Sequence, residues 1–159
     1  HINQKKFIKL GWNSADIETL INELQRYGKE IILTRDIETN NRNMEYYSKY
    51  NIYDFKDSKY INNNSRITLM ENIAGKDLYM IIKNAEKVIA FHGMITSFAW
   101  IDKKKVLDLY FCVINNWNDY RKYRNSFYEF KPIYKDYDFI IPNKDIYKTI
   151  RKMTFFLKK

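Results

Sequence analysis

Cysteine, glycine and proline are scarce in this sequence, and each scarcity excludes a class of protein. The 159 residues include one Cys, four Gly and two Pro. A single Cys cannot form an internal disulfide, so we expect a reducing compartment, the cytoplasm, rather than a disulfide-stabilised secreted protein. Average proteins contain about 12% Gly and Pro together. The low content here argues against collagen-like chains, linker-rich chains and β-sandwiches with many tight turns.

Long hydrophobic runs and metal-binding side chains are also missing. No apolar run reaches the length of about 18 residues that a transmembrane helix needs. One internal histidine, His92, and one cysteine, Cys112, do not make a metal cluster. We therefore expect no metal and no cofactor. Neither a Gly-x-x-x-x-Gly-Lys phosphate loop nor a Gly-x-Ser-x-Gly elbow is present.

Apolar and basic residues are abundant instead. Hydrophobic residues make up 45% of the chain and aromatic residues 17%, which is enough to bury one core in a single domain over residues 1–159. The formal net charge is +9, although Ile, Lys, Asn and Tyr, which AT-rich genomes over-supply, make up nearly half of the chain. Residues 1–102 carry 14 basic and 13 acidic side chains, whereas residues 103–159 carry 14 and 6. The excess positive charge is therefore confined to the second segment.

The first third of the chain predicts a strand, a helix and a second strand. Residues 6–12 are β-prone. Asn13 and Ser14 then supply the N-cap of a helix with apolar residues at i, i+3, i+4 and i+7. Residues 30–34 form a short apolar, β-branched run that is typical of a buried strand. Strand, helix and strand within about 30 residues make a βαβ unit.

Further strands and helices alternate in the remainder. The expected strands are 67–69, 87–91 and 105–110, and the expected helices are 76–84, 96–100 and 143–156. Continuous apolar strands that alternate with helices are typical of an open parallel sheet covered on both faces. We therefore predict a Rossmann-like α/β domain, clearest over residues 7–113. Residues 114–159 are expected to add a basic aromatic segment and a C-terminal helix.

The main candidate site is the loop after the expected strand 87–91. Ligands of open α/β sheets bind at the carboxyl ends of the strands. His92 stands at such an end, and Gly93 permits a tight turn and a close approach of a ligand. Thr96 and Ser97 add hydroxyls near a helix N-terminus, which favours an anion such as phosphate. A purely structural interpretation stays open, in which the glycine only turns the chain, the two hydroxyls only cap a helix and the histidine is a half-buried side chain.

A second candidate site is the loop at Asn13 and Ser14, which follows the expected strand 6–12. This loop would also hold phosphate at a helix N-terminus. It lacks the second and third Gly of a dinucleotide-binding fingerprint. Asn-Ser before a helix is also ordinary capping chemistry, so both interpretations stay open here.

Part of the chain resembles a known family of enzymes. Asn-Ile-Ala-Gly-Lys-Asp-Leu at 72–78 and Ile-Ile-Lys-Asn-Ala-Glu-Lys-Val-Ile-Ala at 81–90 are similar to the donor-binding half of GT-B glycosyltransferases, notably the heptosyltransferase-like group. The following run, 91–96, lacks the Asp and the His of the heptosyltransferase pattern Asp-Ser/Thr-Gly-x-x-His. It is closer to GT-B groups whose loop reads His-Gly-x-x-x-Thr/Ser before a strand Val-Ile-Glu-Leu. Residues 106–109 match that strand, with Asp108 at the acidic position.

The resemblance implies a site for a nucleotide-sugar donor and transfer of the sugar to a glycan or lipid-linked acceptor. Backbone N–H groups of the loop, together with Thr96 and Ser97, would hold the diphosphate, and His92 would hydrogen-bond to it or to the sugar. No metal is required, and the catalytic residue is not identified. GT-B enzymes take the acceptor, and usually the catalytic base, from their other half. We therefore expect this chain, which begins at His1 rather than Met, to be a fragment that binds the donor without completing the reaction.

An alternative interpretation is a non-catalytic basic module that binds nucleic acid or an anionic membrane surface through residues 103–159. Aromatic and basic side chains are interleaved in residues 116–138. Such a surface would suit peripheral contact with the inner face of the membrane, near lipid-linked acceptors. A solvated, lysine-biased face is the simpler explanation. No RNA-binding signature accompanies these residues, so we expect no nucleic-acid partner.

Overall fold

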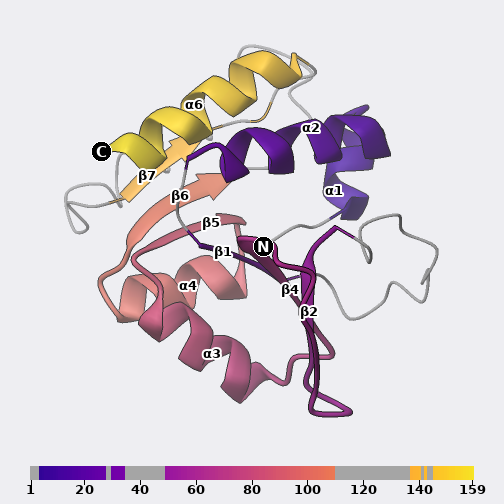
Figure 1. Ribbon diagram of the computed structural model, residues 1–159. Coiled ribbons are helices and arrows are strands. Elements are labelled where there is room, and N and C mark those ends of the chain that lie inside the picture. Colours follow the sequence, from indigo (N-terminus) through magenta and orange to yellow (C-terminus); the bar gives the residue numbers. More distant parts are fainter. Residues whose placement is uncertain (1–3, 28–29, 35–48, 110–136, 141, 143–144) are drawn as a thin grey trace.

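The computed structural model describes residues 4–27, 30–34, 49–109, 137–140, 142 and 145–159. These residues form an α/β arrangement of helices and mainly parallel strands (Figure 1). The helices are α1 (Gln4–Lys9), α2 (Ser14–Gln25), α3 (Gly75–Asn84), α4 (Met94–Ile101) and α6 (Ile146–Lys158). The strands are β1 (Ile31–Thr34), β2 (Asn51–Asp54), β3 (Lys59–Ile61), β4 (Ile67–Glu71), β5 (Lys87–Phe91), β6 (Lys105–Leu109) and β7 (Tyr137–Ile140).

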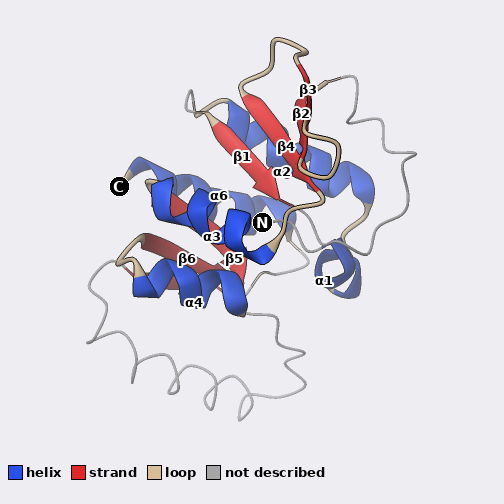
Figure 2. Cartoon of the chain, turned by 90° about the horizontal axis from the view of Figure 1, so that it is seen from below, coloured by secondary structure: helices blue, strands red, loops and turns tan. Residues whose placement is uncertain are grey.

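The strands lie in two sheets. The first sheet has the order β1-β4-β2-β3 and the second has the order β5-β6-β7; Figure 2 shows β1 and β4 apart from β5 and β6. Every neighbouring pair is parallel except β2 and β3, which form an antiparallel hairpin. The predicted mixture of helices and parallel strands is therefore confirmed. The Rossmann-like single domain is not confirmed, because the strands of the described part are divided between two sheets.

The expected strand at residues 6–12 is wrong, because this segment begins with the helix α1. Phe7 and Trp12 are both buried, and their ring centroids lie 4.7 Å apart. The helix directs Phe7 into the core and leaves Ile8 57% exposed. The Trp12 N–H donates to the Phe7 carbonyl. Packing of the two rings outweighs the β propensity of the segment, which is a weak preference. The predicted βαβ unit is therefore replaced by the order α1, α2, β1.

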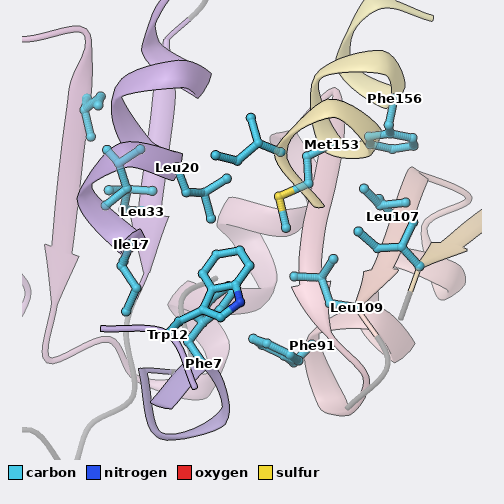
Figure 3. Packing of buried hydrophobic residues seen from close by; sticks show 14 of the residues in the cluster. Phe7, Trp12, Ile17, Leu20, Leu33, Phe91, Leu107, Leu109, Met153 and Phe156 are labelled. Atoms are coloured by element: carbon cyan, nitrogen blue, oxygen red, sulfur yellow. The ribbon is translucent and has the colours of Figure 1, made fainter. Parts of the chain in front are cut away.

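One hydrophobic core connects the two sheets (Figure 3). Its members come from α1, the loop after it, α2 and the first sheet, from β5 and β6, and from α6. They include Phe7, Trp12, Ile17, Leu20, Leu33, Ile67, Leu69, Phe91, Leu107, Leu109, Ile150, Met153 and Phe156. Because Phe91 and Leu109 are the last residues of β5 and β6, this core anchors the carboxyl ends of both strands.

The other expected elements of the described part are found, with shifted ends. α2, α3 and α4 and the strands β1, β4, β5 and β6 lie where the sequence predicts them, within a few residues. α6 begins at Ile146, after Asp145 as its N-cap. Residues 110–136, which include Cys112 and most of the basic aromatic segment, lie outside the described residues. Within the described residues, every helix is too short or too polar to cross a bilayer.

The hairpin of β2 and β3 lies in an Asn-rich stretch without a strand signal. The Asn51 side chain helps to order this polar stretch through hydrogen bonds to the backbone. The Asn51 amide donates to the Ser65 carbonyl at 2.7 Å and accepts the Asn63 N–H at 2.9 Å. The Asn63 amide in turn donates to the Tyr50 carbonyl at 2.7 Å. Such side-chain bonds to the backbone compete with regular structure and are not visible as a periodic pattern.

Candidate functional site

The loop that joins β5 to α4 lies at the carboxyl edge of the second sheet. β5 and β6 are parallel, with Phe91 opposite Leu109. The His92 N–H donates to the Leu109 carbonyl at 3.0 Å, so the pairing continues one residue beyond β5. This bond fixes the His92 backbone at the place where ligands bind in sheets of this kind.

His92 forms a close pair with Asp108 of β6. The His92 Nδ1 lies 2.7 Å from the Asp108 Oδ2. The two side chains share one face of the sheet, because Ala90 is opposite Asp108 and His92 lies two residues beyond it. A carboxylate only accepts hydrogen bonds, so Nδ1 carries the proton and, in a neutral ring, Nε2 is the proton-accepting nitrogen.

Burial differs sharply between the two partners. The Asp108 side chain is fully buried, whereas the His92 side chain is 43% exposed. The indole of Trp100 flanks the imidazole, with ring centroids 6.0 Å apart. The ring is therefore oriented from beneath by a buried carboxylate and from the side by an aromatic ring, while much of its surface remains accessible to a ligand.

Gly93 has a backbone conformation that other residues avoid. Its φ is 153° and its ψ is −152°, a region populated almost only by glycine. A Cβ added at Gly93 would find only the Phe91 carbonyl oxygen, at 4.0 Å. The backbone angle, rather than a lack of space, therefore requires glycine here.

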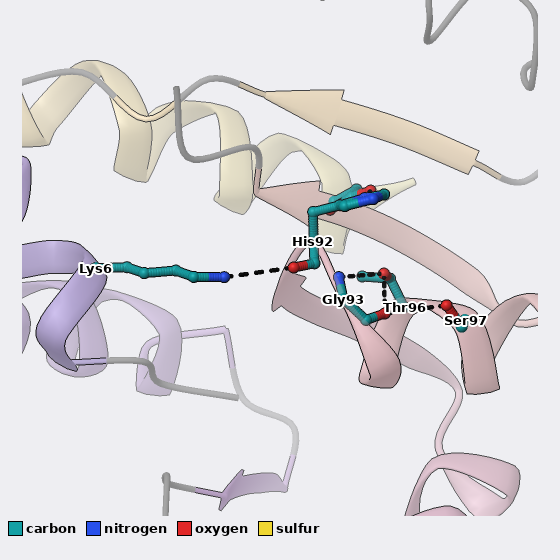
Figure 4. A network of polar contacts seen from close by, with 6 residues as sticks. Lys6, His92, Gly93, Thr96 and Ser97 are labelled. Atoms are coloured by element: carbon teal, nitrogen blue, oxygen red, sulfur yellow. Dashed lines mark hydrogen bonds and ion pairs between the residues drawn. The ribbon is translucent and has the colours of Figure 1, made fainter. Parts of the chain in front are cut away.

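The hydroxyls of Thr96 and Ser97 both contact Gly93 (Figure 4). The Thr96 hydroxyl accepts the Gly93 N–H at 3.1 Å and donates to the Gly93 carbonyl at 2.8 Å. The Ser97 hydroxyl donates to the same carbonyl at 3.1 Å. Thr96 is fully buried and Ser97 is exposed. The Thr96 hydroxyl thus shapes the loop, and of the two hydroxyls only that of Ser97 lies at the surface.

Asn13 caps α2 and is accounted for by that role. Its side-chain oxygen accepts the Asp16 N–H at 3.0 Å, and the Asp16 carboxylate accepts the Asn13 N–H at 2.8 Å. This is a reciprocal capping box. Ser14 is the first residue of α2, and its side chain lies outside the described part. Because residues 6–12 do not form a strand, the loop does not follow the carboxyl end of a strand as the sequence predicted.

Lys6 of α1 belongs to the site and was missed in the sequence. Its Nζ lies 3.4 Å from the His92 carbonyl oxygen (Figure 4) and 5.3 Å from the centroid of the Phe91 ring. No spacing pattern links two residues 86 positions apart. The pairing of Asp108 with His92 also could not be predicted from spacing, although the resemblance to GT-B enzymes placed an acidic residue at position 108.

The loop gathers groups that favour an anion. Lys6 contributes a positive charge, and the first turn of α4 contributes backbone N–H groups and the positive end of the helix dipole. The first turn of α4 carries no acidic residue. The His92 imidazole adds a third polar group, and the Asp108 carboxylate is buried beneath it. A phosphate group is the anion that suits such a site best.

No protein-family model, curated protein or solved structure matches this chain. Within the residues that the structure describes, no three His, Cys, Asp or Glu side chains are grouped so that they could hold a metal ion.

Proposed function

We propose that this chain is the nucleotide-sugar-binding domain of a glycosyltransferase, and that the loop between β5 and α4 holds the diphosphate of the donor. The His92–Asp108 pair, at 2.7 Å, carries the proposal. It places an oriented imidazole at the carboxyl edge of two parallel strands, beside the N-terminus of α4. The order β5, α4, β6 and the parallel pairing of β5, β6 and β7 support a Rossmann-like relationship.

The proposed roles follow from the contacts of each group. Backbone N–H groups in the first turn of α4 would donate to the phosphate oxygens. Gly93 would let the diphosphate approach the backbone, because it has no side chain. His92 would act through Nε2, since Asp108 occupies Nδ1. The neutral ring would accept a hydrogen bond from a sugar hydroxyl, and the doubly protonated ring would donate one to the diphosphate. Thr96 would act indirectly by holding Gly93 in place.

These groups would serve transfer chemistry by stabilising the leaving group. When the bond between the sugar and the nucleoside diphosphate breaks, negative charge develops on the diphosphate. Preorganised donors stabilise such charge more effectively than water does. The acceptor, a glycan or a lipid-linked glycan, and the catalytic base would be supplied by another domain.

Calorimetric titration of the full chain tests the proposal. Uridine, cytidine, guanosine and adenosine diphosphates, and a sugar conjugate of each, would be titrated into the wild type. We expect one nucleotide class to bind, and we expect His92→Ala and Asp108→Asn each to weaken its binding about tenfold, as for the loss of one charge-assisted hydrogen bond.

Lys83→Ala is the matched control, because Lys83 is exposed on α3 and lies outside the loop. It should bind like the wild type. Absence of binding by all the nucleotides, or full affinity in both site variants, would refute the proposal.

A further inference from the structure

The helix α6 has two faces of opposite character. Thr149, Ile150, Met153 and Phe156 are buried against the core. The opposite face carries the basic residues Lys148, Arg151, Lys152 and Lys158, and Lys159 follows as the C-cap; all five are exposed. At 3.6 residues per turn, these five lie within less than half of the helix circumference. The segment Ile146–Lys158 contains no Asp or Glu.

Two large aromatic side chains lie on the same outer face as these cations. Tyr147 is 72% exposed and Phe155 is 59% exposed. The Lys159 Nζ lies 4.5 Å from the centroid of the Phe155 ring. Exposed aromatic rings next to Lys and Arg are typical of helices that lie in a membrane interface, with the rings at the level of the headgroups and the cations above them.

The neighbouring helix α2 has the opposite charge, and its carboxylates are largely engaged. α2 packs beside α6 (Figure 1) and carries Asp16, Glu18 and Glu23 but no basic residue. Asp16 caps its own helix, Glu18 pairs with Lys49 and Glu23 pairs with Arg26. The positive charge of the outer face of α6 is therefore not cancelled by the helix beside it.

We propose that the outer face of α6 docks this protein on an anionic lipid bilayer. Each basic side chain near an anionic surface contributes independently, and the two rings add apolar burial. The outer face of α6 carries both exposed aromatics, which fits a flat bilayer. Single-stranded nucleic acid is bound instead in a groove with stacking platforms. The inference concerns a different surface from the loop after β5, so either proposal can fail without the other.

Vesicle sedimentation with the full chain tests the proposal. The vesicles would contain phosphatidylcholine alone, or phosphatidylcholine and phosphatidylserine in equal parts. We expect binding only to the second kind. The triple variant Lys148→Gln, Arg151→Gln, Lys152→Gln should bind on the order of 100-fold more weakly, as expected for three neutralised charges at an anionic surface. Gln keeps the helix propensity, so the fold should persist in circular dichroism.

Two controls make the test specific. The triple variant Lys59→Gln, Lys76→Gln, Lys83→Gln removes the same charge from exposed residues of β3 and α3 and should bind nearly as well as the wild type. Tyr147→Ser with Phe155→Ser keeps the charge and should weaken binding about tenfold through lost apolar burial. Equal losses of binding in the two triple variants would overturn the proposal, and so would binding to vesicles without phosphatidylserine. It would also be overturned if the aromatic variant bound vesicles like the wild type and the protein bound a single-stranded oligonucleotide more tightly than vesicles.

Discussion

The His92 Nδ1 and the Asp108 Oδ2 lie 2.7 Å apart, although the two residues are 16 positions apart in the sequence. The pair exists because β5 and β6 are parallel neighbours in a register that sets Ala90 opposite Asp108. The fully buried carboxylate cannot turn toward solvent. The orientation of the imidazole therefore depends on the pairing of the strands beneath it.

Asp108→Asn is expected to change the tautomer of His92. In the wild type, Nδ1 donates to the carboxylate, so the neutral ring carries its proton on Nδ1. The amide of Asn can donate to Nδ1 instead, which favours a proton on Nε2. Nitrogen-15 NMR of the neutral imidazole measures this, and the chain has only two histidines. A wild-type ring protonated mainly on Nε2 would contradict the assignment.

Gly93→Ala is expected to destabilise the protein by about 1–3 kcal/mol, because alanine must adopt a strained backbone angle. The new methyl group itself has space. Gly75→Ala is the matched control: Gly75 begins α3 and a Cβ there meets nothing within 4 Å. That substitution should be neutral or stabilising by up to about 1 kcal/mol. Urea unfolding measures both, and equal effects of the two substitutions would show that Gly93 is not strained.

Thr96→Val is expected to lower the free energy of unfolding by about 1–3 kcal/mol. It removes the hydroxyl that bonds the N–H and the carbonyl of Gly93, and leaves these backbone groups without that partner. Valine keeps the shape, so the loss isolates the two hydrogen bonds with Gly93. Ser97→Ala, which removes an exposed hydroxyl, should cost less than about 0.5 kcal/mol. Thermal unfolding compares the two variants. A neutral Thr96→Val would show that the loop does not depend on this cap.

Asn72→Gly is expected to destabilise the protein at pH 7 more than at pH 2. The Asn72 amide donates to Asp54 at 2.9 Å and is the main reason why the pKa of Asp54 lies below its usual 3.8. A lowered pKa in the folded state stabilises the protein above the unfolded-state pKa, and this contribution is lost as the pH falls through the folded-state pKa. Glycine accepts the positive φ of 54° at this position. Urea unfolding at both pH values measures the difference, which should not depend on pH in an Asp54→Asn background.

The candidate loop could be predicted from its sequence, but the way its residues act could not. His92, Gly93 and Thr96 are close in sequence, and a glycine and hydroxyls after an apolar strand are a local signal. The contacts of Lys6 and Asp108 with His92 span 86 and 16 positions. Such contacts depend on strand register and helix packing, which cannot be recognised from the spacing of residues in the sequence.

Local signals in the sequence are sufficient to predict several of the elements. The Asn13 cap and the apolar periodicity that follows define α2, and the β-branched apolar run 87–91 defines β5. The helix at residues 4–9 and the division of the strands between two sheets depend instead on contacts between distant segments. The packing of Phe7 against Trp12 and Phe91, with ring centroids 4.7 and 4.8 Å away, joins distant parts of the chain. Burial of these rings outweighs a backbone preference of less than about 1 kcal/mol per residue.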